Sequence, residues 1–221
     1  MSPPIVTRTQ TRNFPAILGA LCMMAIAAVP SSAQEIAPGT TGVINIYGLV
    51  LRFPLPEWVD VSDPKKILDQ SNYRRDEQSS HLHIDQIPAH ESYDNYKNLY
   101  RIAAVRGTTN SLEGAISALI EENRKNCTPG SFAPFASNPV PDGALVTILC
   151  GKLAGADNSG LGLILHAMVF QRDTVNIYVT REWRGESFSL SETASDSRPV
   201  GSAEFEATSA RFLAQTELVN P

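Results

Sequence analysis

Apolar and polar residues alternate in several short segments of the chain, and this alternation predicts strands. Residues 43–47 alternate, Gly48 interrupts the pattern, and residues 49–53 follow, as in a hairpin of two short strands. The segments Leu161–Phe170 and Val175–Thr180 flank four polar residues and predict a second, clearer hairpin. Further strands are expected over residues 81–87, 131–136 and 144–150.

Three other segments carry apolar residues at helical spacing. The first is residues 93–104, with Ser92 as a candidate cap and Gly107 beyond its end. The second is residues 112–125, preceded by Asn110 as a candidate cap. A last helix is expected to begin near Ser202 and to turn three apolar side chains inward, namely Phe205, Phe212 and Leu213.

These elements predict the fold class. Hairpin connections make a sheet antiparallel, and amphipathic helices then cover its faces. We therefore expect residues 43–221 to form a single α+β domain, an antiparallel sheet flanked by helices. Two polar segments read as irregular: residues 62–80, as a loop or a short surface helix, and residues 185–202, as a mobile loop.

The first 33 residues have the three-part pattern of a cleavable secretory signal. Arg8 and Arg12 precede an apolar run, which ends at Pro30 before the small residues that close with Ala33. The run is shorter than the roughly 20 residues that a membrane-spanning helix needs. We expect cleavage after Ala33, a flexible leader over residues 34–42, a periplasmic or secreted mature protein, and no membrane span in the mature chain.

Charge narrows the range of partners. Removing residues 1–33 takes away two basic residues and no acidic one, so the formal net charge falls from −5 to −7. An acidic chain is a poor ligand for nucleic acid and for anionic membrane surfaces. The expected partner is therefore another envelope or extracellular protein.

Cysteine use agrees with export. Cys22 lies in the signal, which leaves Cys127 and Cys150 in the mature chain. An even pair in an oxidising compartment predicts a disulfide, although two buried free thiols would fit the same count. The bridge would close a loop of 24 residues, which is worth about 3 kcal/mol by loop entropy.

His81, His83 and Asp85 form the sharpest candidate site. On a strand these alternate residues project from one face, where they could bind zinc or copper. His90 and His166 are possible further ligands, although they lie elsewhere in the chain. The alternative is an ordinary solvated strand face, because the intervening apolar residues already explain the alternation.

Other chemistry is weakly represented in the sequence. We find no nucleophile motif and no phosphate-binding loop, so no catalytic residue is assigned and no cofactor is expected. Arg181, Trp183 and Arg184 combine arginine with an aromatic residue, as interfaces often do. The alternative reading is a charged and aromatic outer face of the sheet.

Two short motifs resemble those of PsbP-like domains, which include photosystem extrinsic proteins and small bacterial envelope proteins of the DcrB type. One motif runs from Gly48 to Pro54 and on to Glu57-Trp58, and the other is the late hairpin followed by a closing helix that ends in Ser209–Phe212. The resemblance implies an antiparallel sheet between helices and a non-enzymatic accessory or binding role.

The sequence thus favours an exported, non-enzymatic binding or accessory protein of the bacterial cell envelope. Two alternatives stay open. One is a metal-dependent enzyme or metal carrier that uses His81, His83 and Asp85, and the other is an inhibitor or immunity-type protein.

Overall fold

The computed structural model describes residues 41–63, 66–108, 111–140, 142–158, 160–191 and 198–219. The described residues all belong to one compact unit. The predicted signal, residues 1–33, and most of the predicted leader, residues 34–42, lie outside the described residues. The leader was expected to reach residue 42, but the first strand already begins at Thr41.

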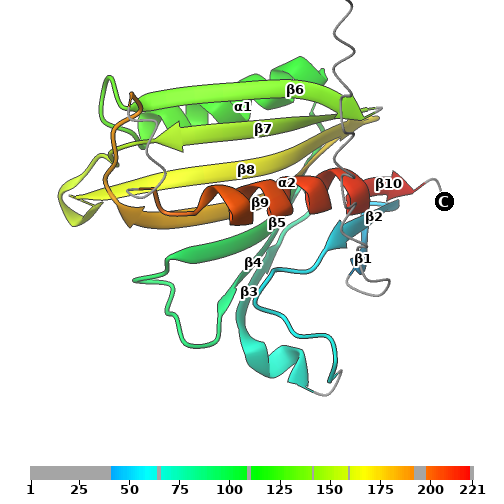
Figure 1. Cartoon of the computed structure of the whole chain (residues 1–221). Coiled ribbons are helices and arrows are strands. Elements are labelled where there is room, and N and C mark those ends of the chain that lie inside the picture. Colours follow the sequence, from blue (N-terminus) through cyan, green and yellow to red (C-terminus); the bar gives the residue numbers. More distant parts are fainter. Residues whose placement is uncertain are drawn as a thin grey trace, which may run out of the picture. The chain divides into compact units, whose positions relative to one another are not determined.

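The strands of the described residues form two antiparallel sheets (Figure 1). The larger sheet has the order β3-β4-β5-β9-β8-β7-β6, and the smaller has the order β1-β2-β10. The larger sheet consists of β3 (Ser71–Glu77), β4 (His81–Pro88), β5 (Asn98–Arg106), β6 (Phe132–Val140), β7 (Gly143–Cys150), β8 (Leu161–Arg172) and β9 (Val175–Glu186). The remaining elements are β1 (Thr41–Ile46), β2 (Leu49–Pro54), β10 (Glu217–Val219), the α-helices α1 (Leu112–Lys125) and α2 (Ser202–Gln215), and the 3₁₀ turns η2 (Leu68–Gln70) and η3 (Ala156–Asn158).

Both predicted hairpins are confirmed. β1 pairs with β2 across Tyr47 and Gly48, whose φ angles are 53° and 90°. Two successive positive φ angles are what a tight two-residue hairpin turn of the favoured hand requires, and glycine adopts them without strain. β8 pairs with β9 along its whole length, from Leu161 opposite Glu186 to Arg172 opposite Val175.

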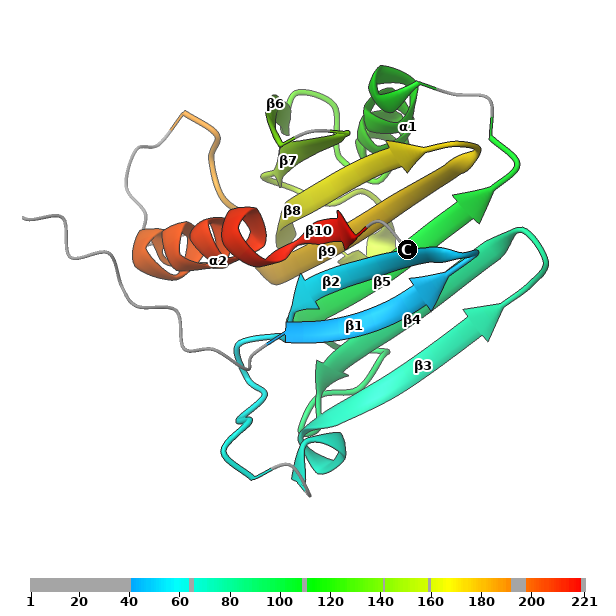
Figure 2. The same ribbon diagram turned by 90° about the vertical axis from the view of Figure 1, so that its right-hand side faces the viewer.

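One face of the larger sheet is covered by the smaller sheet and α2 (Figure 2). Leu51 of β2 and Phe212 of α2 are buried against apolar side chains of β4, β5, β8 and β9. The ring of Phe212 also meets the ring of Tyr100 edge-on, with centroids 6.1 Å apart. This face therefore holds the main core of the protein.

Helix α1 lies on the opposite face, where it packs against β6, β7 and β8. Ala115 and Ile116 are its buried residues. The Ser111 side chain accepts a hydrogen bond from the Gly114 backbone N–H, so the helix cap is Ser111, and the expected cap, Asn110, lies outside the described residues. The coarse fold class is confirmed: a mostly antiparallel sheet with two helices in one domain.

The helix expected over residues 93–104 is wrong, because residues 98–104 of this segment belong to β5. β5 pairs with β4 on one side and with β9 on the other, and its central residues are buried on both faces. A strand that is covered on both faces loses its apolar–polar alternation. Its near-continuous apolar run, from Leu99 to Ala104, therefore matched helical spacing by chance.

Two further expectations need correction. Residues 62–80, expected to be irregular or helical, contain the edge strand β3, whose residues after Ser71 are all exposed. Charged side chains protect a sheet edge from pairing with other chains, and they also hide the alternation. Helix α2 begins at Ser202 as expected and buries Phe212, but Leu213 is 40% exposed and does not face inward.

Candidate functional site

A cleft of about 610 Å³ lies between α1 and the part of the larger sheet beyond it. β4, β5, β8 and β9 contribute to the sheet side of the cleft, and the rest comes from α1, Asn126, Tyr96 and the segment of residues 153–158. Small and apolar side chains line its middle, whereas charged and aromatic side chains surround them. The apolar group includes Ala103, Val105, Ala118, Leu119, Leu163, Leu165 and the ring of Tyr178.

Two arginines share one carboxylate beside the cleft. The side chain of Asp85 is 5% exposed, and Arg101 donates to it from Nε at 2.6 Å and from Nη2 at 3.1 Å. Arg74 of β3 donates to the same carboxylate at 3.2 Å, and its guanidinium lies 4.5 Å from the ring centroid of Tyr93. Burial alone would raise the pKa of Asp85, but the hydrogen bonds and charges of Arg101 and Arg74 lower it below its usual value.

A second charged group lies on β9. Glu182 accepts hydrogen bonds from Arg184 Nε at 2.7 Å and from the Tyr96 hydroxyl at 3.0 Å. The guanidinium of Arg184 lies 4.1 Å from the centroid of the Tyr96 ring. Burial and the neighbouring Glu182 raise the pKa of Tyr96, so this phenol keeps its proton. The three side chains thus hold one another in a fixed arrangement.

His83 lies between these charges and the apolar residues, on the cleft side of β4. Burial and the charge of Arg101 lower its pKa, and these effects outweigh the opposite effects of Asp85 and Asp76. The imidazole is therefore neutral at neutral pH, with one donor and one acceptor nitrogen.

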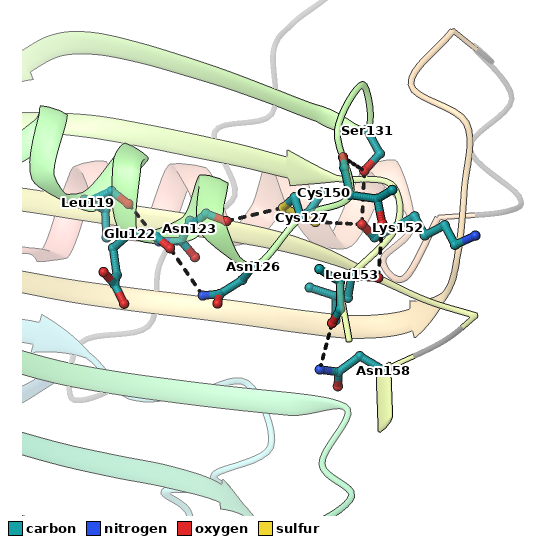
Figure 3. The surroundings of a disulfide bond; sticks show 12 residues. Leu119, Glu122, Asn123, Asn126, Cys127, Ser131, Cys150, Lys152, Leu153 and Asn158 are labelled. Carbon is teal, nitrogen blue, oxygen red and sulfur yellow. Dashed lines mark hydrogen bonds between the residues drawn. A yellow bond between two sulfur atoms is a disulfide. The ribbon is translucent and has the colours of Figure 1, made fainter. Parts of the chain in front are cut away.

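The predicted disulfide is confirmed, and it anchors the helix that walls the cleft. Cys127 follows the C-terminal end of α1, and Cys150 is the last residue of β7 (Figure 3). Just before the bridge, the side chains of Asn123 and Asn126 donate to the backbone carbonyls of Leu119 and Glu122, one turn earlier. The bridge therefore ties the end of the cleft wall covalently to the sheet.

The predicted metal ligands lie on one face of β4, as the alternation indicated. Among the described residues, however, no cluster of three or more His, Cys, Asp or Glu side chains is placed to hold a metal ion. Asp85 is bound by two arginines, His81 is exposed, and His166 is buried under α2 on the opposite face of the sheet. His90 is exposed in the turn after β4, so the metal site stays a prediction without a supporting contact.

The three residues of the predicted interface do not share one surface. The side chains of Arg181 and Trp183 are buried on the α2 side of the sheet, each 2% exposed. Arg181 lies 4.5 Å from the Trp183 ring centroid and forms an ion pair with Glu57 at 3.1 Å. Of the three, only Arg184 reaches the cleft. Arg181 and Trp183 therefore stabilise the packing of α2, and only Arg184 remains a candidate for binding.

The sequence reasoning missed Tyr96, Arg101 and Glu182. Tyr96 and Arg101 fell within the expected helix, where they would not have faced β9. Strand pairing would have revealed them. If residues 98–106 form a strand between β4 and β9, Arg101 lies opposite Asp85, and Leu99 lies opposite Glu182.

Comparisons with known proteins found matches among solved structures. No family model matches the chain, and no curated protein matches it. Two similar solved structures are a point variant of protein Mog1 and the Ran-binding protein Mog1p of Saccharomyces cerevisiae. Each has 9% sequence identity and a TM-score of 0.47, over 81% of this chain and 96% of the other. Within the part of the chain that the structure describes, no helix has the length and apolar character that crossing a membrane requires.

Proposed function

We propose that this chain is an exported, non-enzymatic binding protein of the bacterial cell envelope, and that it binds its partner in the cleft beside α1. The observation that carries the proposal is the difference between the two faces of the larger sheet. One face is covered by α2 and the smaller sheet, whereas on the other face α1 packs against β6, β7 and β8, and the cleft lies beside it.

The chemistry of the cleft supports binding rather than catalysis. Its charged side chains are engaged with one another, as in the pairs Arg101–Asp85 and Arg184–Glu182. His83 is the exception, since a neutral imidazole can act as a general base, but no hydrogen bond within the described residues joins it to a nucleophile. Fixed arginine and aromatic side chains beside an apolar floor instead resemble the composition of binding sites.

The disulfide supports the proposed compartment. Cys127 and Cys150 are both buried, and their bridge joins α1 to the sheet. Structural disulfides persist in oxidising compartments such as the periplasm. Together with the predicted signal of residues 1–33, this supports a periplasmic or secreted protein.

Cell fractionation tests the compartment. We expect the mature protein in the periplasm or the medium, with Gln34 as its first residue on N-terminal sequencing. A cytoplasmic protein that keeps Met1 would contradict export.

Cleft-filling variants test the binding site. Ala103 lines the cleft from β5 and is buried, so Ala103→Leu places extra volume in it. The tagged wild-type protein should retain a defined partner from envelope extract, and Ala103→Leu should lose that partner while keeping its fold. Leu68→Ala is the matched control, because Leu68 is exposed in η2 and should retain the partner. Equal retention by Ala103→Leu and wild type would contradict the assigned site.

A further inference from the structure

The arginines of the cleft have unused donors. Arg101 donates hydrogen bonds to Asp85 from Nε and Nη2, and its Nη1 has no partner among the described residues. Arg184 donates to Glu182 from Nε alone. Its two terminal nitrogens have no hydrogen-bond partner within the same described residues. A guanidinium group has donors and no acceptor, so these positions select a ligand with acceptor atoms.

The buried carboxylates orient these donors. Asp85 holds Arg101 by two hydrogen bonds, and Tyr96 lies against the guanidinium of Arg184. A guanidinium that is fixed in this way loses little side-chain freedom when a ligand binds. Both arginines are also partly exposed, with side-chain exposures of 35% for Arg101 and 28% for Arg184.

The acceptor that these donors fit is a monoanion. The acidic groups of the cleft are already occupied: Glu182 by Arg184 and Tyr96, and Glu122 on α1 by Lys125 at 3.5 Å. A ligand that carried more than one negative charge would still lie beside these carboxylates, where like charges at close range are unfavourable. A carboxylate carries one charge and matches the planar fork of arginine.

The floor of the cleft specifies the rest of the ligand. Ala103 and Val105 follow Arg101 on β5, and with Leu119 of α1 and the Tyr178 ring of β9 they provide apolar surface in the cleft. Burying apolar surface of a ligand contributes roughly 25 cal/mol for each Å² removed from water. The cleft volume of about 610 Å³ also lies within the range of small-ligand pockets, roughly 300–1,000 Å³.

We propose that the cleft binds a carboxylate attached to an apolar body, with the carboxylate on Arg101 and the body over Ala103, Val105 and Leu119. This inference rests on the proposed binding function of the cleft and names its ligand class. The same chemistry occurs in a free apolar acid and in the C-terminal residue of a protein partner.

Calorimetric titration of the mature protein with four probes tests the inference. The probes are octanoate, octan-1-ol, a short peptide that ends in leucine with a free carboxylate, and the same peptide amidated. We expect octanoate or the free-acid peptide to bind at least tenfold more tightly than its uncharged counterpart, because a hydrogen bond to a charged group is worth about 1.5–3 kcal/mol. Binding of octanoate alone would identify a free acid, and binding of the free-acid peptide would identify a chain terminus.

Two variants and a control locate the binding. Arg101→Gln should weaken the bound probe about tenfold or more, since it removes the charged donor. Ala103→Leu should also weaken binding of the probe, because the larger side chain occupies the apolar floor of the cleft. This second variant tests the inference even if Arg101→Gln does not fold. Arg52→Gln should bind like wild type, because Arg52 pairs with Glu217 in the smaller sheet, away from the cleft.

No binding of either acid, or equal binding of acid and uncharged probe, would overturn the inference. The proposed function would survive that result if the envelope partner were still lost from Ala103→Leu. If Ala103→Leu instead retained the envelope partner, the proposed function would be contradicted independently of the probe titrations.

Discussion

Arg101 binds both carboxylate oxygens of Asp85, with Nε at 2.6 Å from one oxygen and Nη2 at 3.1 Å from the other. The two residues are direct partners across β4 and β5. The carboxylate is buried, whereas the guanidinium lines the cleft. This pair therefore links the stability of the sheet to the geometry of the proposed binding site.

Replacing Asp85 with asparagine should destabilise the protein at neutral pH. The change removes the partner of Arg101 and Arg74, but both arginines are partly exposed and regain water, so we expect a loss of about 1–3 kcal/mol. The pKa of Asp85 is lower in the folded protein than in the unfolded chain, where it is near 4. The stabilising contribution of Asp85 is therefore fully present above the unfolded pKa and is lost as the pH falls through the folded pKa. Urea unfolding at several pH values should show a shallower acid decline for the variant.

Asp94→Asn is the matched control for this variant. Asp94 is exposed in the turn before β5, and its replacement should leave the unfolding free energy within about 0.5 kcal/mol of wild type. A similar change in both variants would show that Asp85 has no special role.

Reducing the disulfide should destabilise the fold and release the end of α1. Titration of the unfolded, unreduced mature protein should find no free thiol, because Cys127 and Cys150 are bonded. Replacing both with alanine should lower the unfolding free energy by about 3 kcal/mol, because the unfolded chain is then no longer constrained by the cross-link. Two titratable thiols, or a double variant as stable as wild type, would contradict this role.

His166 should make the protein sensitive to mild acid. Burial lowers the pKa of its imidazole to about 4, and its Nε2 has no hydrogen-bond partner within the described residues. Between pH 6.5 and 4 the unfolded chain takes up a proton that the folded protein does not, so stability falls over this window by about 3 kcal/mol. His166→Phe should remove that part of the decline, since the site already packs against Phe205 and Phe212.

His90 provides a control for the histidine replacement. It is exposed, so His90→Gln should change the unfolding free energy at neutral pH by no more than about 0.5 kcal/mol. An unaltered decline in His166→Phe would assign the acid sensitivity to other groups.

Zinc should not stabilise the protein through His81 and His83. With Asp85 held by two arginines, replacing both histidines by alanine should change the unfolding free energy by no more than about 0.5 kcal/mol. Zinc should leave the melting temperature unchanged, whereas a true ligand pair would add about 2.7 kcal/mol at a hundredfold excess over the dissociation constant. A zinc-dependent shift that disappears in the double variant would favour a metal carrier or enzyme.

The elements that the sequence predicted well are those that bury one face or carry clear turns. β1, β2, β4, β8, α1 and α2 all lie where their patterns placed them, and the disulfide followed from cysteine count and compartment. The failures have a common physical origin. β5 has buried residues on both faces and β3 is exposed almost throughout, so neither strand shows alternation.

The cleft was hidden by the failure at β5. His83 and Asp85 were singled out because of their spacing within β4, but their actual neighbours depend on strand order. Arg101 meets Asp85 only because β5 pairs with β4, and Arg184 reaches Tyr96 from a strand far away in the sequence. Long-range pairing of this kind leaves no mark in local periodicity.

Photo-crosslinking in living cells tests the account most directly. A photoreactive residue at Val105, which lines the cleft, should give one defined crosslinked product in the envelope, and the Arg101→Gln change should abolish it. The same residue at Val43, which is exposed in β1 of the smaller sheet, should give no such product. A defined product from Val43 with none from Val105 would contradict the claim that this protein binds its partner in the cleft beside α1.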